Sequence, residues 1–450
     1  MRVDENTGSN QQTHQISIEN LNIPFLVFKG GIKTQSKLRL FNIGPYKPGK
    51  QRNVKIFSII DADVSVQSER LKSMLKESQI QKILSPSCSN IDIVRSVSSD
   101  YLIKNLHLYK ENLLLILHDG QLDGETHDKM KLLAKRNNVR VQFINISHLD
   151  SSTSFPFKGV IAQVIAKDDG IPWILNIEED EEVFYPNSMI IGVSYSSKYS
   201  RLSYGVAHFI DILNMDEKIE LLKGAMRTDS YRGVLLRDEE FKKIIEGAIE
   251  WYKAKNSKAC DTLHIFFYET APIRKNNIQL ISDLIENPSK IGLSKFEFTH
   301  INIKSANYGV PRIYDTSNLG YDTIYTYMQK RGTYIKIQTQ NNENSFCRRG
   351  EAILGTTGFY IDGYNKPKGT KGTPVPLYCQ VTSNNENAID IVAKQVMKLA
   401  HLDWEYLFQE YRLPFMIKYS TKLASLINQF CSTEQELKDF PTLWDVRDLM

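Results

Sequence analysis

Four polar side chains in the first half of the sequence could together bind a phosphate. His127 and Lys131 are four residues apart, so a helix over residues 126–137 would place both on one face. The first turn of such a helix also attracts an anion, through its unpaired N–H groups and its dipole. Gln142 alternates with apolar neighbours in VRVQFINI and can therefore face a crevice, while Lys167 adds a second cation just before DDGIPW.

The same residues have a plainer interpretation. Polar side chains on a helix face or a strand edge often do no more than face water. Spacing alone favours this solvated surface over an anion site. If the anion site exists, Lys129 and Lys135 lie nearby and could substitute as its cations.

A second feature concerns metal-dependent hydrolysis. The stretch YPNSMIIGVSYSSKYSRLSYGVAHFI (185–210) predicts a buried strand and its hairpin partner. Two-metal nucleases need carboxylates that neutralise the ions and set their spacing. The middle of this strand carries Val193 and Ser194, and neither side chain supplies a charge.

Strands and helices must alternate to position the phosphate-binding side chains. We predict strands over 54–60, 112–119, 139–146 and 171–175, and helices over 68–84, 126–137 and 159–169. This order is typical of a parallel, doubly wound sheet. In that architecture ligands bind at the carboxyl ends of the strands, where helix N-termini point.

An acidic stretch, NIEEDEEVFYPNS (176–188), marks a predicted domain boundary. Beyond it we predict a hairpin over 189–211, strands at 233–236, 262–269, 295–303, 333–340, 353–361 and 375–382, and helices at 238–255, 276–286, 386–400 and 416–431. Three strands followed by helix, strand, helix and strand is the order of an RNase H-like fold. The predicted fold class is α/β, with a flexible tail over 1–20, a Rossmann-like domain over 21–185 and an RNase H-like domain over 186–450.

Composition sets wide limits on function. The 450 residues can form two or three domains, and a net charge of +4 is compatible with a polyanionic partner without requiring one. The five cysteines show no metal-binding spacing, which favours free thiols in a reducing compartment. The polar N-terminus lacks the apolar region of a signal peptide, and no apolar run approaches the ~20 residues that cross a bilayer. We therefore expect a cytoplasmic protein.

Three blocks, in this order, resemble the short prokaryotic Argonautes, which contain only MID and PIWI domains. The blocks are LRLFNIGPYKPG (38–49), then THDKMKLLAKRNNVRVQFINI with IAQVIAKDDGIPWIL, and then PVPLYCQVTSNNENAIDIVAKQVMKLAHLDW with LPFMIKYSTKLASLI. The resemblance covers roughly residues 25–450. It implies a Rossmann-like MID domain and an RNase H-like PIWI domain.

The resemblance also implies a site for the 5′-phosphate of a guide strand. His127, Lys131, Gln142 and Lys167 match the family pattern of Tyr-x-x-x-Lys, then Gln, then Lys, with His127 in place of the Tyr. A histidine would stack less well under a base but could add charge. The C-terminal carboxylate of Met450 would complete the pocket through Mg²⁺, unless the terminus is frayed and exposed.

The resemblance further implies a PIWI domain without slicer activity. Ser194 stands where the family has its first catalytic Asp, and a hydroxyl cannot replace a bridging carboxylate. Glu269 takes the next position, and the last falls at His401 or, in another alignment, at Ser383. Asp211 is an acid that could restore the site.

The implied function is guide-directed binding. A small guide RNA would pair with a complementary single-stranded DNA target, so that base pairing and not the protein reads the sequence. Relatives that do not slice act with an APAZ-domain partner fused to a TIR, sirtuin-like, nuclease or membrane effector, in defence against plasmids or phages. Two alternatives remain: an active guided endonuclease with a divergent metal site, and a Rossmann-like small-molecule binder. No G-x-G-x-x-G follows the first strand, which disfavours the second.

Overall fold

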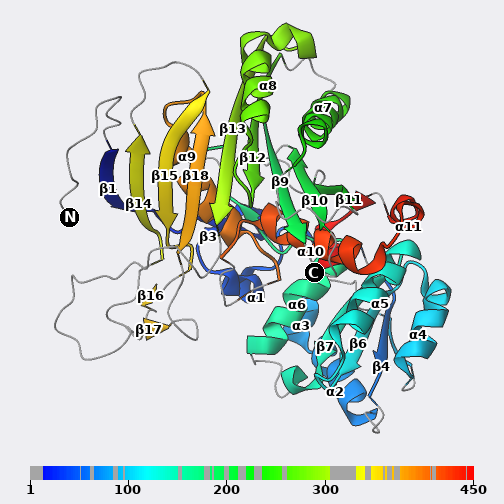
Figure 1. Cartoon of the computed structure of the whole chain (residues 1–450). Coiled ribbons are helices and arrows are strands. Elements are labelled where there is room, and N and C mark those ends of the chain that lie inside the picture. Colours follow the sequence, from blue (N-terminus) through cyan, green and yellow to red (C-terminus); the bar gives the residue numbers. More distant parts are fainter. Residues whose placement is uncertain are drawn as a thin grey trace. The chain divides into compact units, whose positions relative to one another are not determined.

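The computed structural model describes most of the chain, in two compact units (Figure 1). The described residues are 14–50, 52–60, 65–84, 90–94, 97–149, 155–176, 183–184, 187–196, 202–210, 219–227, 236–255, 261–304, 331–339, 346–357, 360–361, 367–368, 376–405, 407, 412–441 and 443–450. Unit 1 comprises Met1–Asn22, Glu182–Ile190 and Leu235–Met397, and unit 2 comprises Ile23–Glu181, Ile191–Val234 and Lys398–Met450.

A four-stranded parallel sheet forms one part of unit 2. Its strands, in the order β5-β4-β6-β7, are Ile91–Ile93, Val54–Ser58, Leu113–His118 and Arg140–Asn145. The central strand β6 reads LLLILH and is buried along most of its length, as expected for a parallel strand with both faces covered. This arrangement confirms the predicted Rossmann-like fold.

Helices connect the parallel strands. They are α2 (Ser65–Lys76), α3 (Ser78–Leu84), α4 (Ser99–Asn105) and α5 (Gly124–Arg136), and α6 (Phe155–Lys167) follows the last strand of this sheet. The helix predicted over 68–84 is therefore two helices, separated at Glu77. The strand predicted over 171–175 is shorter, β8 (Ile174–Leu175), and it pairs antiparallel with β2 (Leu26–Val27) in a separate small sheet that also contains β3 (Lys33–Thr34).

The remainder of unit 2 combines strands with a long C-terminal helix. It contains β9 (Ser188–Ser196) from Ile191 onward, β10 (Leu202–Ile210), β11 (Ile219–Arg227), α10 (Phe415–Phe430), α11 (Glu434–Lys438), β19 (Leu443–Trp444) and α12 (Val446–Leu449). Helix α10 lies very close to β10, because a side chain at Gly205 would clash with the backbone of Ser420. The Ser420 hydroxyl also donates a hydrogen bond of 2.6 Å to the backbone oxygen of Gly192.

Unit 1 is built on a mixed sheet, whose strands lie side by side in Figure 1. In order they are β1 (His14–Asn20), β14 (Thr333–Thr339), β15 (Cys347–Leu354), β18 (Leu377–Ser383), β13 (Lys295–Lys304) and β12 (Thr262–Glu269). β12 and β13 are parallel and the other pairs are antiparallel. The helices are α7 (Asp238–Lys255), α8 (Lys275–Glu286) and α9 (Ala388–His401), which continues past Met397. This order matches the predicted RNase H-like part.

Several boundaries differ from the sequence predictions. Residues 14–20, which we assigned to a flexible tail, form β1 and pair with β14, because Ile16 and Ile18 alternate with polar residues as in a strand. The units also do not coincide with domains over 21–185 and 186–450, since segments on both sides of 185 belong to each unit. The strand predicted at 353–361 is β15 followed by the short β16 (Tyr360–Ile361), and the strand at 233–236 falls mostly outside the described residues. Within the described chain, no helix has the length and apolar character needed to span a bilayer.

Candidate functional site

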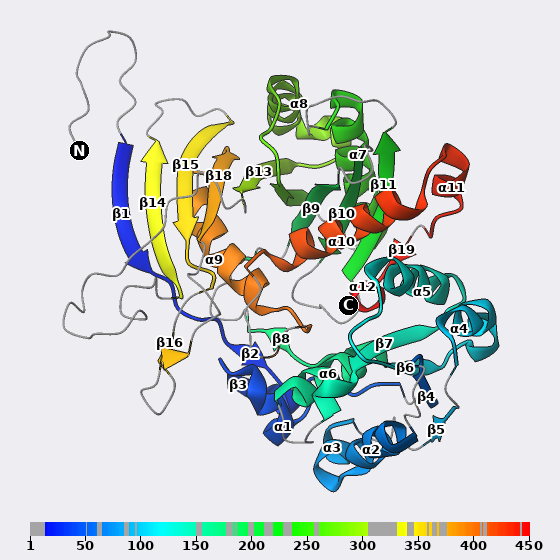
Figure 2. The same cartoon turned by 60° about the horizontal axis from the view of Figure 1, so that its bottom comes forward.

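A pocket in unit 2, with a volume of about 440 Å³, contains most of the predicted phosphate-binding residues. His127 and Lys131 from α5, Gln142 from β7 and Met450 all line it. Lys167, at the end of α6, reaches the same place by donating a hydrogen bond of 3.3 Å to the backbone oxygen of Met450. Figure 1 and Figure 2 both show the end of the chain beside these helices.

Helix α5 begins at Gly124 and so places His127 and Lys131 in its first half. Asp123 caps the helix by accepting a hydrogen bond of 2.8 Å from the backbone N–H of Thr126. His127 and Lys131 then lie one turn apart, in the first half of the helix, as the sequence predicted.

Lys131 is a buried cation with little compensation. It is 8% exposed, and its Nζ donates to the backbone oxygen of Leu449 at 3.4 Å. Within the part of the chain that the structure describes, no carboxylate forms an ion pair with it. Burial, together with the nearby Lys422 ammonium, lowers the pKa of Lys131 to about 7. An anion in the pocket would favour its charged form.

His127 contributes a ring more than a charge. Its ring centroid lies 4.3 Å from that of Phe143, and its Nδ1 lies 3.1 Å from Oδ1 of Asp128. Burial lowers the pKa of His127 below its ordinary value, despite the neighbouring Asp128. The lowered pKa favours the neutral ring of His127, and the His127 and Phe143 rings, tilted by 48° to each other, lie side by side at the pocket.

Gln142 carries an unsatisfied acceptor. Its side-chain nitrogen donates to Gln163 Oε1 at 2.7 Å and to the backbone oxygen of Phe143 at 2.9 Å. Its Oε1 is buried and has no hydrogen-bond partner among the described residues. A buried acceptor without a partner is unfavourable unless a ligand, water or ion satisfies it. The unpaired Oε1 of Gln142 therefore indicates that a ligand, water or ion binds in this pocket.

Lys167 is fully enclosed, at 1% exposure. Burial and the nearby Lys131 hold its pKa well below the ordinary value for lysine. Its position behind Met450 explains why it contributes to the pocket through Met450 and does not line the wall itself.

Two lysines of α10 complete the pocket, and the sequence analysis missed them. Lys422 lies 3.0 and 2.8 Å from the two carboxylate oxygens of Glu405, and Lys418 lies 2.5 Å from both Glu405 and Asp403. Burial raises the pKa of Glu405, but the two ammonium groups outweigh this and lower it to about 2. Lys418 and Lys422 are four residues apart, so the signal used for His127 and Lys131 was present here too.

The other candidate cations have different surroundings. Lys135 pairs with Asp448 at 2.7 Å, so it is not a spare cation for the pocket. Lys129 is exposed on the surface of α5.

The positions that correspond to catalytic acids all have protein partners. The Ser194 hydroxyl lies 2.7 Å from that of Thr421 in unit 2, where His401 contacts the backbone oxygen of Gln35 at 3.2 Å. In unit 1, Glu269 pairs with His300 at 2.9 Å, and Ser383 is also buried and hydrogen-bonded. Asp211 lies outside the described residues. Among the described residues, no group of three or more His, Cys, Asp or Glu side chains is placed to bind a metal ion.

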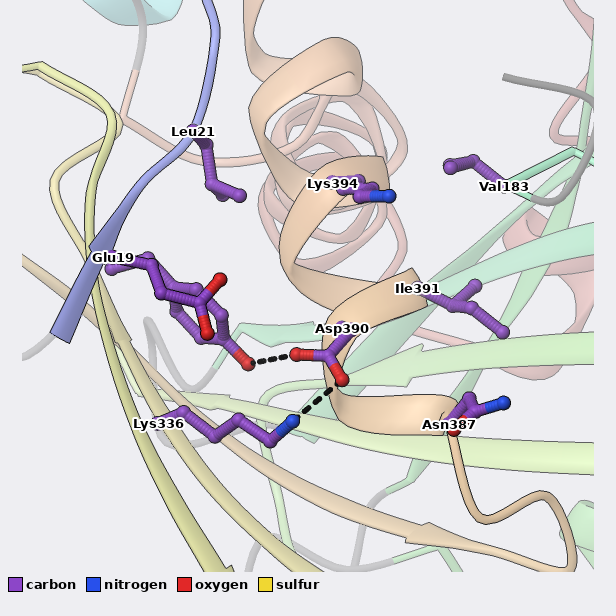
Figure 3. A pocket seen from close by; sticks show the side chains of 9 residues that line it. Glu19, Leu21, Val183, Lys336, Asn387, Asp390, Ile391 and Lys394 are labelled. Atoms are coloured by element: carbon purple, nitrogen blue, oxygen red, sulfur yellow. Dashed lines mark hydrogen bonds and ion pairs between the residues drawn. The ribbon is translucent and has the colours of Figure 1, made fainter. Parts of the chain in front are cut away.

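Unit 1 has a second cavity, of about 460 Å³, shown in Figure 3. Asp390, in the first turn of α9, accepts hydrogen bonds from the Tyr334 hydroxyl at 3.0 Å and from Lys336 at 2.6 Å. Glu19 and Lys394 add one charge of each sign to its lining. Its lining holds two acids and two lysines, and none of its buried polar atoms lacks a hydrogen-bond partner among the described residues, whereas Gln142 Oε1 does in the unit 2 pocket. The unit 2 pocket is therefore the better candidate site.

Mg²⁺ in proteins is usually held by one or two carboxylates together with phosphate oxygens and water. The oxygens that the unit 2 pocket offers are the unpaired amide Oε1 of Gln142 and the backbone oxygen of Met450, which already accepts from Lys167.

Comparison with solved structures shows which known fold this chain resembles. No protein-family model and no curated protein matches the sequence. Among solved structures, a Clostridium butyricum Argonaute bound to a guide DNA (5′ deoxycytidine) and a 19-mer target DNA is similar, with a TM-score of 0.62, 16% identity and coverage of 92% of this chain and 53% of that chain. This chain thus has an Argonaute-like α/β fold and spans about half the length of that Argonaute.

Proposed function

We propose that the chain is a guide-directed nucleic-acid-binding protein of the short prokaryotic Argonaute type, with MID and PIWI domains. Its unit 2 pocket binds the 5′-phosphate of the guide. The observation that carries this proposal is the buried Lys131, which faces a backbone carbonyl and has no counter-ion among the described residues. A phosphate supplies the missing negative charge, and charge-assisted hydrogen bonds to it are strong.

The surrounding residues support the same ligand. Lys418 and Lys422 bring two more ammonium groups to the pocket, and the rings of His127 and Phe143 offer a surface on which a base can stack. Mg²⁺, held by Gln142 Oε1 and the backbone oxygen of Met450, would neutralise part of the phosphate charge. The likeness in fold to an Argonaute solved with guide and target DNA supports this class of ligand.

The remaining parts of the proposal follow from this anchoring. The guide is a small RNA, and it pairs with a complementary single-stranded DNA, so that base pairing reads the sequence. The chain binds its target without cutting it, because Ser194 supplies a hydroxyl in place of a carboxylate. Target recognition activates an APAZ-domain effector partner in the cytoplasm, in defence against plasmids or phages. Co-expression with candidate effectors tests this last part, since a stable heterodimer that stays inactive until guide and target are present is expected.

The pocket is tested with one short RNA, made with and without a 5′-phosphate. Lys131→Ala should weaken binding of the phosphorylated RNA by about 10- to 150-fold, which corresponds to the ~1.5–3 kcal/mol of a charged hydrogen bond. Binding of the 5′-hydroxyl RNA should change little. Lys129→Ala removes an exposed lysine of the same helix and is the matched control. Equal losses for both RNAs in Lys131→Ala would show that the pocket does not bind the 5′-phosphate.

A further inference from the structure

The last residues of the chain lie along one face of α5. His127, Lys131 and Lys135 follow each other at intervals of four residues, so they share this face. Lys131 donates to the backbone oxygen of Leu449, and Lys135 pairs with the carboxylate of Asp448 at 2.7 Å. Helix α12, which contains Asp448 and Leu449, packs against α5 and α6. The phosphate pocket and the final turn of the chain are thus held by the same helix.

Asp448 has a second cation. Arg140, at the start of β7, forms an ion pair with Oδ1 of Asp448, whose side chain is only 4% exposed. The other side of the Arg140 guanidinium contacts Asp169 at 3.2 Å, and Asp169 also accepts from Arg52 at 2.6 Å. Burial raises the pKa of Asp169, but these arginines outweigh it and lower the pKa to about 2. Arg140 is therefore held between two carboxylates, those of Asp448 and Asp169.

The ion pairs of Asp448 have to hold a very short helix in place. Helix α12 has four residues, and an isolated segment of that length does not form a helix. Asp448 also closes the turn by accepting a hydrogen bond of 2.9 Å from the backbone N–H of Asp445. The backbone oxygens that follow reach the pocket lysines: Leu449 accepts from Lys422 at 3.0 Å, and Met450 from Lys167 at 3.3 Å.

We propose that Arg140, Asp448 and Lys135 form a latch that positions the backbone oxygens of Leu449 and Met450 among the pocket lysines, and so sets the selectivity of the pocket for a 5′-phosphate. This inference rests on the proposed function. The latch residues do not touch the phosphate and act through the lysines. With the latch closed, flexible lysine side chains are held by fixed acceptors in the arrangement that a phosphate needs. With the latch open, Lys131, Lys167 and Lys422 lose these backbone acceptors, although Lys422 keeps its contact with Glu405.

The experiment removes one charge and keeps the shape. Asp448→Asn should reduce the preference of the full chain for a short 5′-phosphorylated RNA over the same RNA with a 5′-hydroxyl by about tenfold, as small displacements of positioning groups typically do. The affinity for the 5′-hydroxyl RNA should stay unchanged, which shows that the variant is folded. Asp448→Glu keeps the charge and should restore most of the preference. Asp92→Asn breaks the Lys55–Asp92 ion pair of 2.8 Å in the same unit and should leave the preference intact.

A spectroscopic measurement separates positioning from a general loss of stability. The NMR signal of the Met450 methyl group is assigned by comparison with Met450→Leu. Its chemical shift should change to that of a solvent-exposed methionine in Asp448→Asn and stay unchanged in Asp92→Asn. A wild-type protein without preference for the 5′-phosphate overturns the proposed function. A wild type that has the preference, with Asp448→Asn retaining it or with Met450 unmoved, overturns the latch alone.

Discussion

Lys131 on α5 and Lys422 on α10 donate to the same acceptor, the backbone oxygen of Leu449, at 3.4 and 3.0 Å. A buried ammonium group and a partly buried one, whose side chain is 32% exposed, repel each other beside one carbonyl. Burial is the main cause that lowers the pKa of each, and for Lys131 the charge of Lys422 is the next. The two positive charges are unfavourable together until an anion binds between them. Binding of the anion should therefore be linked to protonation of these lysines, and this linkage can be measured.

The first prediction is that the protein takes up a proton when it binds a 5′-phosphorylated RNA. The pKa of Lys131 is about 7, so at pH 8 this lysine is mostly neutral, and a bound phosphate would raise its pKa and charge it. The phosphate itself is already fully ionised at pH 8, because its second pKa is ~6. Titration calorimetry at pH 8 in buffers of different ionisation enthalpy should show uptake approaching one proton. The 5′-hydroxyl RNA and the Lys131→Ala variant should show much less, and equal uptake in all three would contradict the model.

The second prediction concerns stability. The pKa of Lys131 is about 7 in the folded protein, against an ordinary value of 10.5, so between these values the unfolded chain binds more protons. The contribution of Lys131 therefore destabilises the fold fully below pH 7, and this effect fades as the pH rises towards 10.5. Lys131→Met should raise the free energy of unfolding at pH 7 by about 1–3 kcal/mol, since an apolar residue often replaces a buried charge favourably. Urea unfolding should show that this gain shrinks at pH 9. Lys129→Met, at an exposed position of the same helix, should show neither effect.

The third prediction concerns Glu405, which holds both α10 lysines. Glu405→Gln removes the negative charge between Lys418 and Lys422 and leaves one buried and one partly buried cation less compensated. The free energy of unfolding should fall by about 1–3 kcal/mol, less than for a fully buried pair because the Glu405 side chain is 19% exposed. Inorganic phosphate should then raise the melting temperature of the variant more than that of the wild type, since the anion replaces the lost charge. Identical shifts for the two proteins would argue against a shared anion site.

The sequence predicted the parts of the site that depend on local structure. The spacing of His127 and Lys131 and the alternation around Gln142 are both visible within a few residues, and the structure places these side chains together. The cap at Asp123 and the helix start at Gly124 were not predicted. The four-residue spacing of Lys418 and Lys422 was visible in the same way. Nothing local showed that these lysines or Glu405 would approach α5, because that depends on packing between segments that are far apart in the chain.

The same limit explains the main error in the fold. Residues 14–20 carry a weak alternation in a polar stretch, and only pairing with residues 333–339 shows that they form a strand. The strand at 333–340 was predicted from its own pattern, but neither segment shows locally that it pairs with the other. The sequence also could not show that Lys135 forms an ion pair, because its partner Asp448 lies far away in the sequence, in α12.

The last prediction is that the chain alone does not cut its target. In two-metal hydrolysis the ions need bridging carboxylates, and Ser194 offers a hydroxyl that is already hydrogen-bonded to Thr421 at 2.7 Å. Glu269, the nearest equivalent of a second acid, is buried and pairs with His300 at 2.9 Å. RNA-loaded protein, incubated with labelled complementary DNA or RNA and Mg²⁺ or Mn²⁺, should leave the target intact. Ser194→Asp should not create activity, because it supplies one carboxylate next to Thr421 while Glu269 stays paired. A cut opposite the middle of the guide that Glu269→Ala abolishes would instead show a working metal site.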